Sequence, residues 1–245
     1  MNEQYKVQVQ NLVDDLKAVF THAGLGGEAG EYKLLTQSFL YKFLNDKFLY
    51  EAQNVDSENT YEHLVSMSEE DYDWLLEDIG TSTAWMKPNQ FIETLHRKQN
   101  ESDFYETFEN TLNQIAIDNN DIFSVHTDEN TTVRLFNERL ITDIIPDSSK
   151  RNEVAKSIIN LLARVKFDEA IFSQGFDFFS TLFEYMIKDY NKDGGGKYAE
   201  YYTPHSVAKI IAEILVGNDK PQNVRVYDPS AGSGTLLMNL ASRIG

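Results

Sequence analysis

The chain has 245 residues, of which 41% are hydrophobic and 12% aromatic, which is enough for a packed core and excludes a wholly disordered chain. It contains no cysteine, so disulfide frameworks and thiolate metal sites are excluded. The net charge of −17 lies in residues 1–150, which carry 28 acidic and 11 basic residues, whereas residues 151–245 carry 11 of each. This imbalance predicts two domains with different surfaces. The acidic one would repel nucleic-acid phosphates and is either a solvated face or a surface that docks a basic partner.

No stretch approaches the roughly 18 consecutive apolar residues that span a bilayer, and the N-terminus lacks the pattern of a secretory signal peptide. We therefore expect a cytoplasmic protein that does not contact a membrane.

Apolar side chains recur at helical spacing through the first part of the chain. Residues 12–20, 34–48 and 104–115 each place them on one face of a helix. The glycine-rich run at 24–30 predicts a break between the first two helices.

Two further helix starts are predicted from capping residues. Ser68, followed by Glu70 and Asp71, predicts an N-cap with acidic residues in the first turn. Pro88 predicts the first residue of a helix that continues through Leu95. No alternating strand pattern appears before residue 220, so the N-terminal part is predicted to be all-α.

A domain boundary is expected near Pro146 and the polar residues 147–150. This divides the chain into an acidic helical N-terminal domain, residues 1–148, and a second domain, residues 149–245. The second domain begins with a predicted helix over 154–165.

The chain then alternates between helix, loop and strand. Residues 177–190 predict a strongly amphipathic helix, which ends at a flexible loop at 191–196. Residues 224–227 (VRVY) are the first credible strand. A glycine-rich turn at 228–235 (DPSAGSGT) and the start of a helix follow, an order that lets the backbone pass close to a nucleotide-like ligand.

The chemistry of this turn suits S-adenosylmethionine. Gly232 and Gly234 can adopt positive φ and leave room for a ligand, and the following helix offers unpaired N–H groups to a carboxylate. Asp228, at the end of the strand, suits an ammonium group. Leu237 stands where the dinucleotide-binding fingerprint needs a small residue, and no Gly-Lys-Ser/Thr follows, so neither that fingerprint nor a P-loop is present.

A second motif precedes the turn. Residues 197–204 read KYAEYYTP, in which Thr203 and Pro204 predict the N-cap and first turn of a helix over 207–214.

Together, the two motifs resemble those of amino-methyltransferases, in which an aromatic-Tyr-Thr-Pro segment precedes an acid-Pro-x-x-Gly-x-Gly loop. Residues 196–235 are most similar to the modification (M) subunit of type I restriction-modification systems, the HsdM family. Residues 39–48 and 183–187 resemble its upstream helices. This resemblance implies a mainly α fold: an all-α domain followed by the start of an α/β Rossmann-like methyltransferase domain, truncated at residue 245.

The resemblance also implies which residues surround S-adenosylmethionine. They are Glu200, Tyr201, Tyr202, Thr203, Pro204, His205, Asp228, Gly232, Ser233, Gly234 and Thr235. Thr203 and the nearby backbone would hold the methionine end, and the turn would offer backbone N–H groups. Family members often carry arginine where this chain has His205, which puts a charge contact there in doubt.

The implied reaction is transfer of a methyl group to the N6 amine of an adenine flipped out of double-stranded DNA. The family presents that amine to an Asn/Asp-Pro-Pro-aromatic motif, and none occurs here because all five prolines are isolated. We therefore expect no catalytic residue in this chain, no methyl transfer by it alone, and weak or no cofactor binding. The implied partners are a specificity subunit, a restriction subunit and DNA.

An alternative is an acidic helical interaction module that docks a partner without enzymatic activity. Two other readings find no support. The five histidines are scattered without metal-ligand spacing, so no metal site is expected. Ser233 lacks the Gly-x-Ser-x-Gly context of a hydrolase nucleophile.

Overall fold

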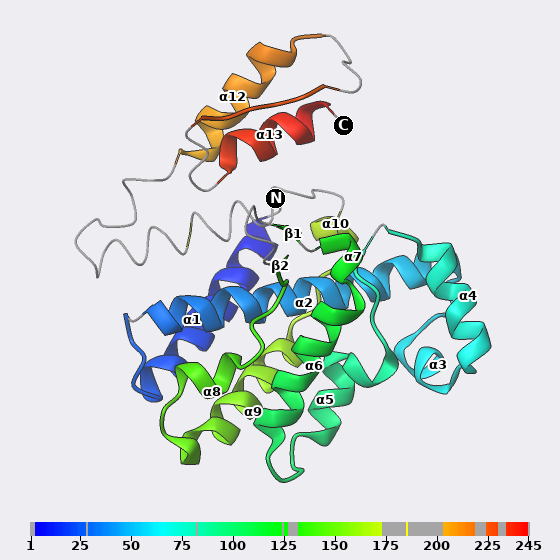
Figure 1. Cartoon of the computed structure of the whole chain (residues 1–245), viewed down its shortest axis with the longest axis vertical. Coiled ribbons are helices and arrows are strands. Elements are labelled where there is room, and N and C mark those ends of the chain that lie inside the picture. Colours follow the sequence, from blue (N-terminus) through cyan, green and yellow to red (C-terminus); the bar gives the residue numbers. More distant parts are fainter. Residues whose placement is uncertain are drawn as a thin grey trace. The chain divides into compact units, whose positions relative to one another are not determined.

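A computed structural model describes residues 3–27, 29–81, 83–123, 125–126, 132–172, 185, 203–218, 224–229 and 234–244. Contacts between Cα atoms divide the chain into a helical unit, Asn11–Phe172, and a C-terminal unit made of Ser173–Gly245 with Met1–Gln10. Both are drawn in Figure 1, and each is described by itself. Among the described residues no helix is long and apolar enough to cross a membrane.

The fold is mainly helical, as predicted. The described elements are, in chain order, α1 (Glu3–His22), α2 (Ala29–Val55), α3 (Tyr61–Ser66), α4 (Glu69–Ile79), η1 (Pro88–Gln90), α5 (Ile92–Lys98), α6 (Phe104–Asp118), α7 (Asn120–Phe123), β1 (Val125–His126), β2 (Thr132–Val133), α8 (Leu140–Ile144), α9 (Ser148–Arg164), α10 (Glu169–Phe172), α12 (His205–Val216) and α13 (Thr235–Ile244).

The long helices form where apolar residues recur at helical spacing, so the helices predicted at 12–20, 34–48 and 104–115 are confirmed in α1, α2 and α6. The core of the helical unit is rich in aromatic rings, and its largest fully buried side chains include Tyr41, Phe39, Phe48, Phe91 and Phe108. In Figure 1, α2 crosses the middle of this unit.

Helix α4 begins as predicted. The Ser68 hydroxyl accepts a hydrogen bond from the Asp71 amide. This satisfies a helix-start N–H that would otherwise lack a partner. Tyr72, Leu75 and Ile79 of α4 are buried, spaced by three and four residues on one face.

The helix predicted from Pro88 through Leu95 is interrupted. The 3₁₀ helix η1 ends at Gln90, and Phe91 is extended (φ −69°, ψ 146°) before α5 begins at Ile92. Two backbone groups that would form hydrogen bonds within a continuous helix bond instead to side chains of α2. The Tyr41 hydroxyl donates to the carbonyl of Gln90 (2.6 Å), and Asn45 Oδ1 accepts from the amide of Ile92 (2.9 Å).

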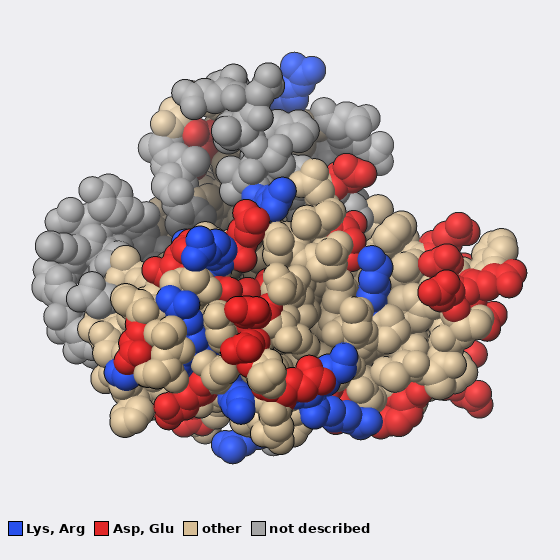
Figure 2. Space-filling model, turned by 60° about the horizontal axis from the view of Figure 1, so that its bottom comes forward, with Lys and Arg blue, Asp and Glu red and all other residues tan. Residues whose placement is uncertain are grey.

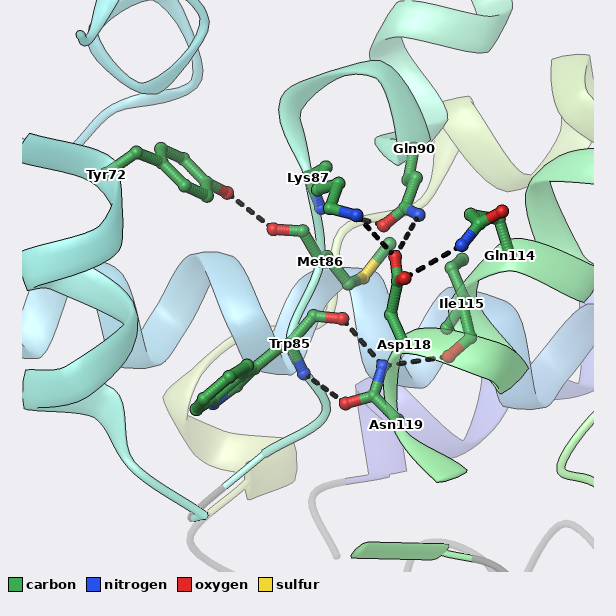
Figure 3. A network of polar contacts seen from close by, with 9 residues as sticks. All are labelled: Tyr72, Trp85, Met86, Lys87, Gln90, Gln114, Ile115, Asp118 and Asn119. Carbon is green, nitrogen blue, oxygen red and sulfur yellow. Dashed lines mark hydrogen bonds and ion pairs between the residues drawn. The ribbon is translucent and has the colours of Figure 1, made fainter. Parts of the chain in front are cut away.

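Figure 3 shows how the segment before η1 is held against α4 and α6. Tyr72 of α4 donates its hydroxyl hydrogen to the carbonyl of Met86 (2.6 Å). Asn119, at the end of α6, accepts from the amide of Trp85 (2.7 Å) and donates to its carbonyl (2.8 Å). Asp118 pairs with Lys87 Nζ at 3.0 Å. The segment therefore has a fixed path although it is not helical.

A buried ion pair links α2 to the chain that follows α9. Lys42 and Asp46, 4% and 6% exposed, lie one turn apart with 2.8 Å between Nζ and Oδ2. The same Oδ2 accepts a hydrogen bond from the amide of Phe167 (2.7 Å). Burial lowers the pKa of Lys42, and the neighbouring Asp46 carboxylate partly opposes this.

The domain boundary expected after residue 148 stays a prediction. The compact helical unit extends past that residue to Phe172. Helix α9 follows that boundary and contacts α5, α6 and α8, with Val154, Ile158 and Leu162 among its buried residues. The division found from contacts accordingly lies between Phe172 and Ser173.

The described part of the C-terminal unit contains α12 and α13 joined through residues 224–229. The strand predicted at 224–227 is not formed, since these residues have no regular secondary structure. A strand requires hydrogen bonds from a neighbouring strand, and no described segment supplies one. The described strands are instead β1 and β2, which pair Val125 with Val133 in the helical unit, where no strand was expected. The predicted helix at 177–190 and loop at 191–196 lie outside the described residues, apart from residue 185.

Candidate cofactor-binding site

The structure describes six of the eleven predicted cofactor residues, and all six lie in the C-terminal unit. The described ones are Thr203, Pro204, His205, Asp228, Gly234 and Thr235. The remaining ones, outside the described residues, are Glu200, Tyr201, Tyr202, Gly232 and Ser233.

The start of α12 differs by one residue from the prediction. The N-cap is Pro204 instead of Thr203, and it makes no side-chain capping bond. The carbonyl of Pro204 accepts from the amides of Val207 (3.0 Å) and Ala208 (3.1 Å), which starts the helix from the backbone alone. The Thr203 hydroxyl lies one residue too early to take the capping position.

His205 makes a specific contact with α13. Its Nδ1 lies 3.1 Å from Nδ2 of Asn239, and the same amide nitrogen donates to the carbonyl of Thr235 at 2.8 Å. Asn239 is 6% exposed. Two residues from the two motifs, His205 and Thr235, are thereby connected through one buried side chain.

Gly234 has the geometry that the glycine-rich turn requires. Its φ of +74° is strained for any residue with a Cβ. A Cβ built there would meet nothing within 4 Å, so the backbone conformation and not crowding favours glycine. Its carbonyl accepts from the amide of Met238 (2.9 Å), which makes Gly234 the residue from which α13 starts.

Asp228 lies at the edge of a small apolar cavity of about 180 Å³. Its lining residues are Ile211, Ala212, Leu215, Val226, Tyr227, Asp228, Pro229, Leu236, Leu237 and Leu240. Ligand pockets usually measure at least about 300 Å³, and Asp228 is the one charged group among the described residues that line this cavity. We conclude that the cavity is packing space between the helices and the 224–229 segment, next to the candidate site.

Helices α12 and α13 run parallel. His205, at the start of α12, contacts Asn239 in α13. Near the ends of both helices, Arg243 donates to Glu213 (2.7 Å) and to the carbonyl of Gly217 (2.7 Å). The starts of the two helices therefore lie at the same end of the pair.

Neither Asn239 nor Arg243 was predicted from the sequence. Asn239 follows Thr235 by four residues, so a polar residue on the buried side of an otherwise apolar helix was the available signal. Arg243 had none, since its partners come from a different helix. Among the described residues, no three His, Asp or Glu side chains gather as a metal site would require.

Comparison with known proteins relates this chain to DNA methylases. Residues 174–245 match the model of the N-6 DNA methylase family. The chain is 25% identical over 222 residues to the type I restriction enzyme MpnII methylase subunit of Mycoplasma pneumoniae, covering 87% of this chain and 39% of that protein. It is 34% identical over 58 residues to the HindI methylase subunit of Haemophilus influenzae, covering 24% of this chain and 12% of that protein.

The fold is also similar to that of a solved structure. The crystal structure of a type I restriction-modification system methyltransferase subunit from Streptococcus thermophilus matches 97% of this chain and 50% of its own length, with a TM-score of 0.62 and 19% identity. The chain thus spans half or less of the proteins that it resembles. These matches confirm the resemblance to type I modification subunits that the two motifs indicated.

Proposed function

We propose that this chain, with its confirmed resemblance to type I modification subunits, is the cofactor-binding part of a site-specific DNA adenine-N6 methyltransferase. The observation that carries the proposal is the turn before α13: a positive-φ glycine at Gly234 starts the helix, and Asp228 precedes it. Such a turn brings the backbone close to a ligand and leaves helix N–H groups free for an anion.

The arrangement of α12 and α13 supports the proposal that this unit is part of an α/β fold. Consecutive helices that flank one strand of a parallel sheet run parallel to each other, as these two do. The unit also exposes large apolar side chains, with Ile214 74%, Leu215 68% and Tyr227 86% exposed. In our proposal, residues 224–227 are a sheet strand in the full methyltransferase domain, and neighbouring strands cover these side chains.

Three parts of the two motifs have a proposed role toward S-adenosylmethionine, which supplies an activated methyl group when bound. The Asp228 carboxylate attracts the ammonium group of the methionine moiety. The N–H groups at the start of α13, behind Gly234, hold its carboxylate. His205 acts indirectly, because its contact with Asn239 holds the start of α12 beside the glycine turn.

The whole subunit would transfer the methyl group to the N6 amine of an adenine flipped out of the DNA. A specificity subunit would read the DNA sequence and a restriction subunit would complete the system. These 245 residues contain no Asn/Asp-Pro-Pro-aromatic motif, and we expect a polypeptide of these residues alone to transfer no methyl group and to bind the cofactor weakly.

The test compares two glycine substitutions in the full-length subunit. Gly234→Ala and Gly217→Ala both place a Cβ at a positive φ with open space around it (+74° and +59°). Gly217 ends α12 and lies away from the turn in sequence, so it controls for backbone strain. We expect calorimetry to show at least tenfold weaker cofactor binding for Gly234→Ala and for Asp228→Asn, and unchanged binding for Gly217→Ala. Equal binding by all variants would overturn the proposed site.

Methyl transfer is tested separately with the specificity subunit present. We expect transfer of labelled methyl groups to adenine in DNA that carries the system's recognition site. The alternative, an interaction module without enzymatic activity, predicts no transfer and no cofactor binding by the full-length subunit. The acidic surface of the helical unit favours a docking role as well, and the two roles are compatible in one subunit.

A further inference from the structure

A long acidic stretch of the helical unit lacks lysine and arginine. Residues 48–86 contain ten aspartates and glutamates and no lysine or arginine. This stretch includes α3 and α4. Figure 2 shows acidic side chains gathered at the right-hand end of the unit, where α3 and α4 lie, without basic ones among them.

Trp74 is exposed in the middle of this acidic helix. Its side chain is 63% exposed, although tryptophan is usually among the most buried residues on average. The opposite face of α4 is firmly packed, because Tyr72 stacks on Phe48 (ring centroids 6.4 Å apart) and donates to the carbonyl of Met86. The orientation of α4 is therefore fixed, and the outward position of Trp74 follows from it.

Four acidic residues occupy the helix positions next to Trp74. The positions three and four residues away on either side are its surface neighbours in a helix, and here they are Glu70, Asp71, Glu77 and Asp78. All four are exposed. Asp71 accepts a hydrogen bond from the hydroxyl of Ser68 (2.6 Å). No ion pair holds any of the four within the part of the chain that the structure describes.

We propose that the outer face of α4, defined by Trp74, Glu70, Asp71, Glu77 and Asp78, docks an arginine-bearing protein surface. The face of an indole ring attracts cations, and guanidinium groups both stack on it and pair with carboxylates. Lysine offers a point charge without the planar stacking surface. Phosphate-rich nucleic acid is repelled by this face, and so is a second copy of the same face, since like charges would meet. This face would serve the docking role proposed above for the acidic surface. Docking there requires neither cofactor binding nor methyl transfer.

The test uses two short peptides of equal charge, one alternating arginine with glycine and the other lysine with glycine. In a ¹⁵N-labelled polypeptide of these 245 residues, the two tryptophans give two indole N–H signals, and Trp74→Leu assigns them. We expect the arginine peptide to shift the Trp74 signal and to leave the Trp85 signal in place. We expect the lysine peptide to bind about two- to fivefold more weakly, which is the size of an exposed cation–π contact.

Variants distinguish this face from general acidity. Trp74→Leu and the pair Glu70→Gln with Glu77→Gln should each weaken binding of the arginine peptide, and binding should vanish near 1 M salt, where screening acts over about 3 Å. The matched control removes the exposed carboxylates of Glu101 and Glu138, which lie outside α4, and should leave binding unchanged. Equal binding of both peptides, equal loss in the control, or a shift of the Trp74 signal by a DNA duplex would each overturn the proposal. None of these outcomes bears on the cofactor measurements, so the two proposals fail independently.

Discussion

The amide nitrogen of Asn239 lies 3.1 Å from Nδ1 of His205 and 2.8 Å from the carbonyl oxygen of Thr235. A carbonyl oxygen can only accept, so the bond to Thr235 identifies the NH₂ end of the Asn239 amide. That group has two hydrogens and can donate to both partners. One of these hydrogens points to Thr235, and the other is available for Nδ1 of His205.

This contact is expected to hold α12 and α13 together. Asn239→Ala removes both hydrogen bonds from a buried position, which should cost about 1–3 kcal/mol of local stability. Hydrogen–deuterium exchange of the α12 and α13 amides measures this as faster exchange in both helices. Met238→Ala, at a half-exposed neighbouring position, is the control and should leave exchange nearly unchanged. Faster exchange in α13 alone would mean that Asn239 does not couple the helices.

Replacing one partner of the buried Lys42–Asp46 ion pair should destabilise the protein more than replacing both. Lys42→Met leaves the Asp46 carboxylate buried without its cation, and we expect the free energy of unfolding to fall by about 3–5 kcal/mol. Adding Asp46→Asn removes that charge and keeps an oxygen that accepts from the amide of Phe167. The double variant should therefore recover part of the loss in urea denaturation. A double variant that is less stable than Lys42→Met would contradict this account.

Asp118 should make the stability of the helical unit depend on acid pH. Burial raises the pKa of Asp118, but hydrogen bonds from Lys87, Gln114 and Gln90 outweigh it and hold the pKa below its ordinary value of 3.8. A carboxyl group with a lowered folded-state pKa stabilises the fold above its unfolded pKa. That contribution is lost as the pH falls through the folded value.

The check is the pH dependence of Asp118→Asn. Lys87 is 55% exposed, so solvent weakens its ion pair with Asp118. We therefore expect the substitution to lower the free energy of unfolding by about 1 kcal/mol at neutral pH. The difference from the unmodified protein should stay constant down to about pH 4 and shrink at lower pH. Glu101→Gln, at an exposed position, serves as control. A difference that does not change between pH 7 and pH 2.5 would refute the role of the Asp118 charge.

Gly30 should tolerate no side chain while Ile144 is present. A Cβ at Gly30 would lie 2.6 Å from Cγ2 of Ile144 in α8, so Gly30→Ala should cost about 1–3 kcal/mol through overpacking. Ile144→Ala removes that methyl group. In the Ile144→Ala background the same glycine substitution should cost little, and denaturation of the four proteins measures the coupling. Equal costs in both backgrounds would show that the close approach is not the cause.

Features that depend on neighbours along the chain could be predicted from the sequence. The capping bond of Ser68, the apolar faces of α1, α2 and α6, and a glycine with positive φ at 234 all arise within a few residues. The glycine break was also foreseen, although α2 already begins at Ala29 and includes Gly30. The two motifs indicated the family, because their spacing in the sequence is itself the signal.

Features that depend on distant partners needed the tertiary structure. Asp46 accepts from Phe167, 121 residues away, and Tyr41 with Asn45 interrupts the helix expected after Pro88. The 224–227 segment reads as a strand, yet strands form only when another strand supplies hydrogen bonds. The sequence by itself therefore determined the long helices α1, α2 and α6, the cap at Ser68 and the motif order, which are local. Only the tertiary structure decided where α9 packs and that Asn239 reaches His205, because those contacts unite residues that lie far apart in the sequence.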